Sequence, residues 1–320
     1  MKNCRIYPNG EFSIWEEARK VRVSGPPDQP DYLGLSLLPN SHRVALGLSE
    51  PVAPRGKRGL KGITRHGART VRNAAYLLEK QYGGDCLTFL TCTLPPVLES
   101  DELGAAREWA EIVRVFVQGL GRLLKAAGLK ASYVGCTEIQ GKRYQERGGM
   151  PLHLHMVFPG RKPGCSWAIS SDQFRALWRR AVVGHASGYE SASFAASVDT
   201  QRVKRSAQGY LGKYMSKGPG QVSAILDDDP GMAEFIPSSW WQCSLNLRRA
   251  IGRRITGGKE TANRLSRDIT AGDSRVEFSR EVTIEVEGGK PFTVALVGKL
   301  SGEGRAKYCF RPGRIPSILD

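Results

Sequence analysis

The chain has 320 residues, 40% of them hydrophobic, and its 47 Lys and Arg against 31 Asp and Glu give a net charge of +16. It is long enough to bury the cores of roughly two domains, and no apolar run approaches the ~18–20 residues that cross a membrane. Seven cysteines without a Cys-x-x-Cys pair argue against a disulfide framework and a thiolate zinc site, and the polar start predicts a cytoplasmic location.

The positive charge is concentrated in a few segments. No acidic residue occurs from Pro51 to Leu78 or from Thr200 to Leu226. A Lys or Arg that neutralises a phosphate releases condensed counterions, so these segments predict a nucleic-acid partner. A basic protein without such a partner is the alternative. The residues predicted to contact DNA are Arg55, Lys57, Arg58, Lys61, Arg65, Arg69, Arg72, Arg202, Lys204, Arg205, Arg248 and Arg249.

The first part of the chain predicts an irregular segment, a helix, a strand and a longer helix. Prolines scattered over residues 1–54 indicate loose structure, and an apolar stripe predicts a helix over residues 64–82. Residues 86–94 are apolar and β-branched and end at a Pro-Pro pair, which predicts a buried strand. Apolar residues at spacings of three and four then predict one long helix, with Ser100 as its N-cap.

The next two predicted strands carry candidate metal ligands. Residues 133–140 and 151–158 read as strands joined by a polar loop over 141–149. Successive side chains on a strand alternate between its faces, so His153 and His155 share a face that points away from the main apolar layer. Neutral imidazoles are common ligands of divalent metals. An incidental His-x-His pair is the alternative.

Glu138 on the preceding strand is the predicted third ligand. A carboxylate adds negative charge and suits Mg²⁺ or Mn²⁺. A site of two histidines and one carboxylate also holds zinc or non-haem iron, so the ligand set alone leaves the metal open.

A helix that carries two tyrosines follows further along the chain. A capping-box pattern at Ser170 opens one helix, and residues 200–217 contain another, predicted to end at Gly218. Leu211 and Met215 would anchor this second helix in the core. At about 100° per residue, one face of it holds Tyr210, Lys213, Tyr214 and Lys217.

These four residues are the candidate catalytic groups. A phenol attacks phosphorus poorly at neutral pH because its pKa is about 10. A metal on the scissile phosphate and a nearby ammonium group such as Lys213 would assist it by stabilising developing charge. The alternative is an amphipathic helix whose tyrosines pack and whose lysines are solvated.

The remaining segments complete a predicted α+β fold. A third basic cluster lies within residues 234–255, and alternating residues over 282–297 predict a hairpin around residues 287–290. The strand–helix–strand–strand–helix order predicts an antiparallel sheet with helices on one face.

Three blocks of sequence, in this order, resemble the rolling-circle replication initiators of small phages and plasmids, in the His-hydrophobic-His (HUH) endonuclease superfamily. Phe89–Pro95 resembles the first motif of that family, and Pro151–His155 resembles its metal motif. Tyr210–Lys217 is similar to the two-tyrosine signature of gene A-type phage initiators. The resemblance covers about residues 86–217 and implies a ferredoxin- or RRM-like sheet with N- and C-terminal extensions. The implied domains are a basic, DNA-binding extension over 1–75, an endonuclease domain over 76–256 and a small β-rich region over 257–320.

By this resemblance we expect an endonuclease that uses Mg²⁺ or Mn²⁺ to nick and religate single-stranded origin DNA through a 5′-phosphotyrosine. A host helicase and polymerase in the bacterial cytoplasm are the expected partners, and no membrane is involved. Single-tyrosine relatives use the tyrosine that precedes the lysine, here Tyr210, and the two-tyrosine reading makes Tyr214 its partner. The alternatives are a transposase or relaxase of the same superfamily, or a non-catalytic RRM-like nucleic-acid-binding protein. Relaxases place their tyrosine near the N-terminus, which the order here disfavours.

Overall fold

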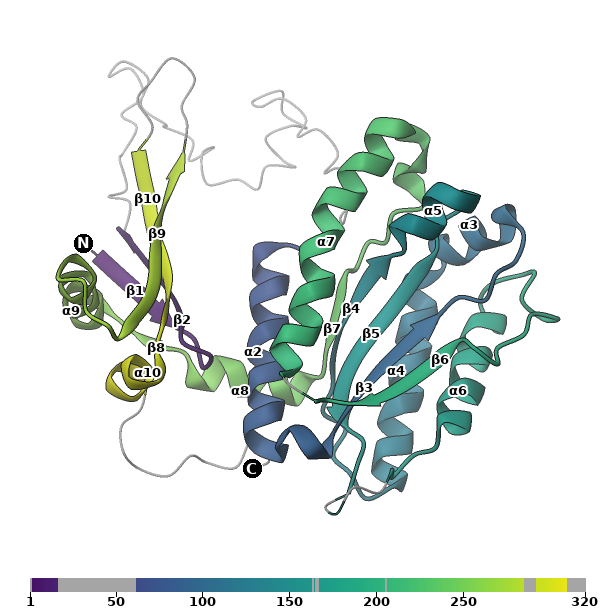
Figure 1. The fold of residues 1–320 in the computed structure, drawn as a ribbon, viewed down its shortest axis with the longest axis horizontal. Helices are drawn as coiled ribbons and strands as arrows, with labels where there is room; N and C mark the ends of the chain where they lie inside the picture. The colour runs from purple at the N-terminus through teal and green to yellow at the C-terminus, as the bar shows by residue number, and fades with distance from the viewer. Residues whose placement is uncertain are drawn as a thin grey trace, which may run out of the picture.

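A computed structural model describes residues 2–16, 62–162, 164, 167–204, 206–284 and 292–309 of the chain. These residues form a mixed α+β architecture with two antiparallel sheets of five strands each (Figure 1). One of them, which we call the site sheet, has the strand order β6-β3-β5-β4-β7. The other, the terminal sheet, has the order β8-β1-β2-β10-β9.

The site sheet contains the three strands that the sequence predicts. β3 (Leu87–Thr93) and β4 (Val134–Ile139) both pair antiparallel with the central β5 (Leu152–Pro159), and β6 (Val198–Arg202) and β7 (Trp241–Cys243) form the edges. The register sets Thr91 opposite His155 and Glu138 opposite His153. This pairing brings the candidate ligands of two strands side by side.

One face of the site sheet packs on the main core. Leu152, Leu154, Met156 and Phe158 of β5 point into it and are fully buried. The helices on this side are α3 (Glu99–Arg107), α4 (Trp109–Ala126) and α6 (Ser171–Val183). The capping box predicted at Ser170 is present at the start of α6.

Two helices stand where the sequence predicts one. The break lies at Glu108, whose ψ of 3° leaves the helical region, and Ser100 lies inside α3 because the N-cap is Leu98. The break aims Trp109 into the core, where its indole N–H donates to Thr137 Oγ1 at 3.0 Å. The apolar spacing continues across the break, so periodicity alone does not reveal it.

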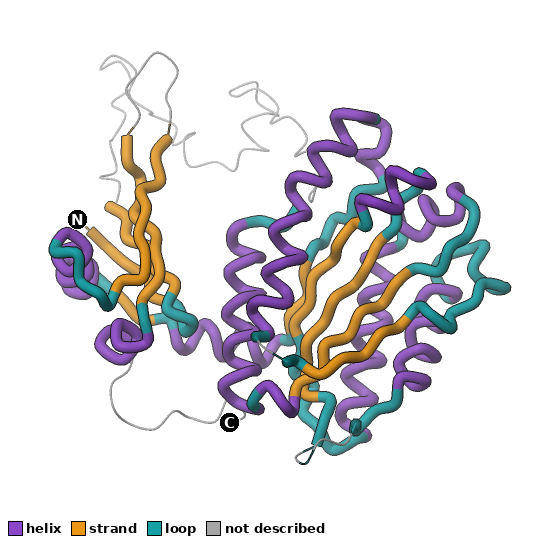
Figure 2. The backbone as a smooth tube through the Cα atoms, viewed as in Figure 1, coloured by secondary structure: helices purple, strands orange, loops and turns teal. Residues whose placement is uncertain are grey.

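The opposite face of the site sheet is covered as well, so the prediction of helices on one face is wrong. α2 (Arg65–Tyr82), α7 (Ala207–Asp228) and α8 (Leu245–Arg254) pack there, and Figure 2 shows the strands between two helical layers. The reason is that Phe89, Val134 and Val157 make much of this face apolar too. A sheet that is apolar on both faces needs a helical layer on each.

Two local predictions fail in the connecting segments. The predicted loop at 141–149 contains the short helix α5 (Gly141–Arg147). Helix α7 does not end at Gly218 but continues through Pro219 to Asp228. A proline inside a helix loses one backbone hydrogen bond, but Val222 and Ile225 beyond it are buried in the main core, and this burial offsets the loss.

The terminal sheet joins the two ends of the chain. β1 (Lys2–Ile6) and β2 (Glu11–Glu16) pair with the C-terminal strands β8 (Thr256–Gly257) and β10 (Phe292–Leu300), and β9 (Val276–Ile284) flanks β10. Helices α9 (Lys259–Thr270) and α10 (Gly302–Cys309) accompany it. Residues 2–16 are therefore strands rather than loose structure. The predicted hairpin is formed by β9 and β10, and its turn at 287–290 lies outside the described residues.

Helix α2 lies between the two sheets (Figure 1). The β1–β2 turn docks on it, since the backbone N–H of Asn9 donates to Asn73 Oδ1 at 3.1 Å and both residues are buried. Residues 2–16 belong to the terminal sheet, whereas α2 packs on the site sheet. The predicted boundary at residue 75 lies inside α2. Among the described residues, no helix is long and apolar enough to cross a membrane.

Candidate metal centre

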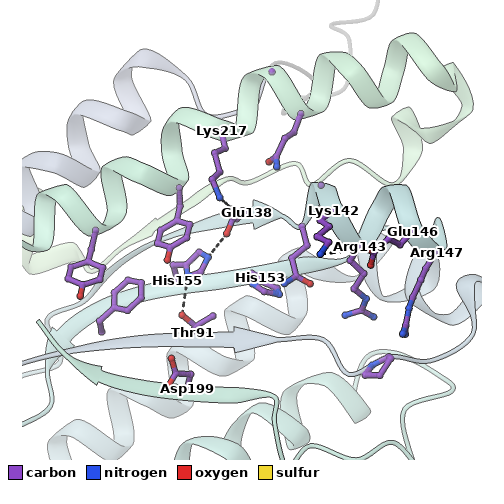
Figure 3. A pocket seen from close by; sticks show the side chains of 18 of the residues that line it. Thr91, Glu138, Lys142, Arg143, Glu146, Arg147, His153, His155, Asp199 and Lys217 are labelled. Carbon is purple, nitrogen blue, oxygen red and sulfur yellow. Dashed lines mark hydrogen bonds and ion pairs between the residues drawn. The ribbon is translucent and has the colours of Figure 1, made fainter.

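Three buried side chains converge on the helix α7 side of the site sheet. Glu138 on β4 and His153 and His155 on β5 are 6%, 8% and 2% exposed, and each offers one ligand atom within 4.8 Å of the others. Figure 3 shows them at the centre of a pocket. We call these three residues the triad. Nitrogen and carboxylate donors in this number and spacing could hold a metal ion.

The hydrogen bonds of the triad are incomplete. Glu138 accepts from His155 Nε2 at 2.8 Å and from Lys217 Nζ at 2.8 Å. His153 Nε2 is buried and has no hydrogen-bond partner among the described residues. Buried polar atoms are nearly always paired, so an unpaired imidazole nitrogen beside a carboxylate fits a position that a metal would take.

Thr91 on β3 holds His155 from the other side, with its Oγ1 3.1 Å from His155 Nδ1. A ring nitrogen that binds a metal must be unprotonated. If Nε2 is the ligand, the proton moves to Nδ1, where the Thr91 hydroxyl can accept a hydrogen bond from it. The same hydroxyl can instead donate to Nδ1 when Nε2 carries the proton, so Thr91 supports both tautomers.

The protonation states also suit a cation. Burial lowers the pKa of His153 to about 3, and burial lowers the pKa of His155 although its hydrogen bond to Glu138 acts in the opposite direction. Burial alone would raise the pKa of Glu138, but its bonds to His155 and Lys217 outweigh this and lower it. At neutral pH the triad therefore offers two neutral imidazoles and one carboxylate, which are the forms that bind metals.

This burial predicts a pH-dependent stability. The folded chain resists protonation of His153 down to about pH 3, whereas the unfolded chain takes up that proton below about pH 6.5. The free energy of unfolding should therefore fall as the pH is lowered from about 6.5 to about 3. His153 should contribute up to about 1.4 kcal/mol per pH unit to this fall. Urea denaturation with a chelator at about pH 6 and about pH 4 should show a shallower dependence for His153→Ala than for the wild type. An identical dependence in both proteins would contradict the burial of a neutral His153.

Helix α7 is fixed above the triad at both its start and its inner face. Ser206 caps it by accepting from the Gly209 N–H at 3.4 Å, and Glu79 of α2 accepts from the Ala207 N–H at 3.3 Å. Leu211 is fully buried and Met215 is 5% exposed. These contacts set the rotation of the helix, so that the neighbouring side, with Tyr214 and Lys217, is turned toward the triad.

Both tyrosines of α7 reach the site. The Tyr214 ring stacks on the His155 ring, with centroids 3.6 Å apart and planes 16° apart. One turn earlier, the Tyr210 ring packs on Phe89 at 4.8 Å. Burial and the Glu138 carboxylate raise the pKa of Tyr214, so nearby positive charge is needed before it can act as a nucleophile.

Both lysines of the same helix face also lie at the site. Lys213 Nζ and Lys217 Nζ lie 5.7 Å and 5.6 Å from the centre of the Tyr214 ring. Lys217 additionally forms the ion pair with Glu138. The structure therefore gathers the seven residues predicted for catalysis and metal binding around one point.

Six of these seven residues, all except Lys213, line a cleft of about 1140 Å³. Its floor includes Phe89, Thr91 and the β6 residues Asp199 and Gln201, and its far end is formed by α5 with Lys142, Arg143 and Arg147. Sequence reasoning missed these contributors. The positions on β3 and β6 depend on strand register, and the polar residues 141–149 predict a loop rather than α5. The signal for α5 in the sequence is three basic residues within six positions.

The predicted DNA-contacting residues are dispersed, and those that the structure describes do not line the cleft. Five of them are exposed and lie on α2, β6 and α8 or close to these elements: Arg65, Arg202, Lys204, Arg248 and Arg249. Arg55, Lys57, Arg58, Lys61 and Arg205 lie outside the described residues.

Arg69 and Arg72 have a different surrounding from the one predicted. Arg72 hydrogen-bonds Glu11, and Arg69 lies 3.5 Å from the same carboxylate and donates to the Tyr7 hydroxyl at 3.1 Å. These bonds tie α2 to the β1–β2 turn. Both guanidinium groups therefore hold the two sheets together in this structure.

Comparisons of the chain with protein-family models, with curated proteins and with solved structures gave no match. What the site does must therefore be inferred from its geometry and chemistry.

Proposed function

We propose that the chain is a DNA endonuclease and strand transferase that cleaves and rejoins single-stranded DNA through a 5′-phosphotyrosine link, as a rolling-circle replication initiator. The observation that carries this proposal is the stacking of Tyr214 directly on His155 of the triad. The triad offers donors for a metal ion, and the Tyr214 phenol contacts it in a protein of high positive charge. This combination suits phosphodiester transfer better than most other chemistry.

The proposed metal is Mg²⁺ or Mn²⁺, held by the triad. When bound there, it would polarise the scissile phosphate and neutralise charge that develops on its oxygens. Lys213 and Lys217 place ammonium groups beside the Tyr214 ring, where they stabilise the phenolate as the phenol loses its proton.

In the proposed reaction a tyrosine oxygen bonds to the phosphorus and the bond to the 3′-oxygen breaks. The phenol loses its proton and the departing 3′-oxygen gains one. One phosphodiester is replaced by another, so the released 3′-hydroxyl can attack the phosphotyrosine and reseal the strand. No external energy source is needed.

The geometry favours Tyr214 as the first nucleophile, because it contacts the triad while Tyr210 lies one helical turn away over Phe89. Tyr210 would then serve a second cleavage while Tyr214 holds the first 5′ end. This assignment differs from that of single-tyrosine relatives, which use the tyrosine at the Tyr210 position.

The arrangement of layers disfavours the non-catalytic alternative. An RRM-like binder stacks bases on aromatic residues of an open sheet face, but helices cover both faces of the site sheet. A transposase of the same superfamily would share the proposed chemistry. Cleavage of origin DNA but not of mobile-element ends would separate the two.

The proposed biological setting is the bacterial cytoplasm, with origin DNA as substrate and a host helicase and polymerase as partners. The exposed arginines of α8, Arg248 and Arg249, are available for phosphate contacts outside the cleft.

The test uses single-stranded oligonucleotides that tile the replicon carrying the gene, with Mn²⁺ and a label at either end. Under denaturing conditions the 3′-labelled fragment should migrate with the protein, and the 5′-labelled fragment should be released with a free 3′-hydroxyl. Chelation of Mn²⁺ should abolish both products. Covalent retention of the 5′-labelled fragment, or undiminished cleavage in chelator, would contradict the proposal.

A further inference from the structure

Helix α5 is a rigid part of the cleft. Arg143 donates to the Leu94 carbonyl at 3.0 Å and to Glu102 Oε2 at 3.2 Å, and its side chain is only 16% exposed. Just beyond the helix, the Gly149 N–H donates to Glu99 Oε1 at 3.2 Å. These bonds fasten α5 to α3 and to the end of β3, so the helix has a fixed position relative to the triad.

Its other two basic residues face solvent at the cleft. Lys142 has an 89% exposed side chain, and its only salt bridge among the described residues is a long one of 3.7 Å to the exposed Glu146. Arg147 is exposed and makes no salt bridge within the described part of the chain. Both line the same cleft as the triad and the tyrosines. Because neither charge is held by a strong ion pair within the described residues, both are well suited to bind a phosphate.

The cleft has a definite order along β5. Tyr210 lies over Phe89, which is paired with Val157, and Tyr214 lies over His155. Lys217 follows at Glu138, which is paired with His153. Helix α5 comes next, because it directly precedes the start of β5, and Figure 3 shows Lys142, Arg143 and Arg147 beyond His153. Glu138 and His153 of the triad therefore lie between the tyrosines and α5.

This order bears on the direction of the DNA strand. In phosphoryl transfer the attacking and leaving oxygens lie roughly in line on opposite sides of phosphorus. With a tyrosine attacking from one side of the triad, the departing 3′-oxygen leaves toward the other side, where α5 lies.

We propose that Lys142 and Arg147 of α5 bind the sugar-phosphate backbone of the DNA segment that ends in the departing 3′-hydroxyl. The proposal rests on the proposed function and adds the placement and polarity of the strand. Held there, the 3′ end stays close to the phosphotyrosine, which raises its effective concentration for resealing.

The test compares two double variants that remove the same charge. Lys142→Ala/Arg147→Ala alters the cleft, and Arg122→Ala/Lys125→Ala alters exposed residues of α4 on the opposite side of the sheet. Alanine favours helix at all four positions. Both are built on Tyr210→Phe/Tyr214→Phe, so that binding is measured without cleavage.

Fluorescence anisotropy with oligothymidylate should show a roughly ten-fold loss of affinity for the α5 variant alone, with a salt dependence of log K smaller by about 1.4 for two lost phosphate contacts. Oligonucleotides that end or begin at the cleavage position then test polarity. The α5 variant should lose affinity for the one that ends in the 3′-hydroxyl, and its resealing yield in the tyrosine-containing protein should fall.

Equal oligothymidylate binding by the two double variants would overturn the α5 site whether or not the protein cleaves DNA. A loss confined to the oligonucleotide that begins at the cleavage position would overturn the polarity. Absence of any covalent adduct with the wild type would instead overturn the proposed function, and the strand assignment with it.

Discussion

The Tyr210→Phe/Tyr214→Phe variant is expected to form no covalent DNA adduct. Its rate of cleavage of single-stranded DNA should fall by a factor of at least about 10³ relative to the wild type. Phenylalanine keeps the ring that packs on Phe89 and on His155 and removes only the oxygen that would bond to phosphorus. Affinity for oligothymidylate should therefore stay within about two-fold of the wild-type value. Gel mobility of end-labelled DNA and anisotropy measure the two effects separately.

The single variants refine this prediction. Tyr214→Phe should lose most of the first cleavage, whereas Tyr210→Phe should keep it and lose the second cleavage that strand exchange requires. Tyr133→Phe is a matched control, because this tyrosine is next to β4 and does not line the cleft. Normal adduct formation by the double variant would show that neither tyrosine is the nucleophile.

Removing the triad histidines is expected to abolish both metal binding and cleavage. For the wild type, Mn²⁺ at about a hundred times its Kd should stabilise the fold by roughly 2.7 kcal/mol, which thermal unfolding detects as a rise in Tm. His153→Ala/His155→Ala should show no such rise. Without metal, His153→Ala is expected to lose only modest stability. The Nε2 of His153 has no hydrogen bond to lose, and truncation of the side chain leaves mainly a cavity.

His185→Ala provides the control for this variant, because His185 follows α6 on the other side of the site sheet. It should retain both the Mn²⁺-dependent rise in Tm and the cleavage. A triad variant that still gains stability from Mn²⁺ would place the metal elsewhere, and one that still cleaves DNA would remove the metal from the reaction.

Regular spacing explains why part of the site can be predicted from the sequence. Side chains on a strand repeat every two residues, so His153 and His155 must share a face, opposite Leu152 and Leu154, in any strand that contains them. The helical repeat likewise puts Tyr210 and Tyr214 on one face of α7. Antiparallel pairing of neighbouring strands then brings Glu138 opposite His153.

Features that depend on tertiary contacts could not be predicted in this way. Helix α5 is too short to show an apolar repeat, and its place is fixed by Arg143 bonds to Leu94 and Glu102. Helix α7 crosses Pro219 because of what Val222 packs against.

Charge patterning has the same limit. A run of arginines predicts a polyanionic partner, but it does not distinguish a guanidinium that faces DNA from one that pairs with a distant carboxylate. Arg72 bonds Glu11, which belongs to the other sheet and is far away in sequence. The count of basic residues therefore overestimates the surface that remains for nucleic acid.

Mapping of the adducted peptide tests the central claim most directly. After reaction with Mn²⁺ and single-stranded DNA, nuclease digestion would leave a nucleotide remnant on the attacking residue. Trypsin cleaves after Arg205, Lys213 and Lys217, so it separates Tyr210 in the peptide 206–213 from Tyr214 in the peptide 214–217. We predict the remnant on the peptide with Tyr214 after a single turnover. DNA cleavage with no nucleotide on either peptide would contradict the phosphotyrosine account.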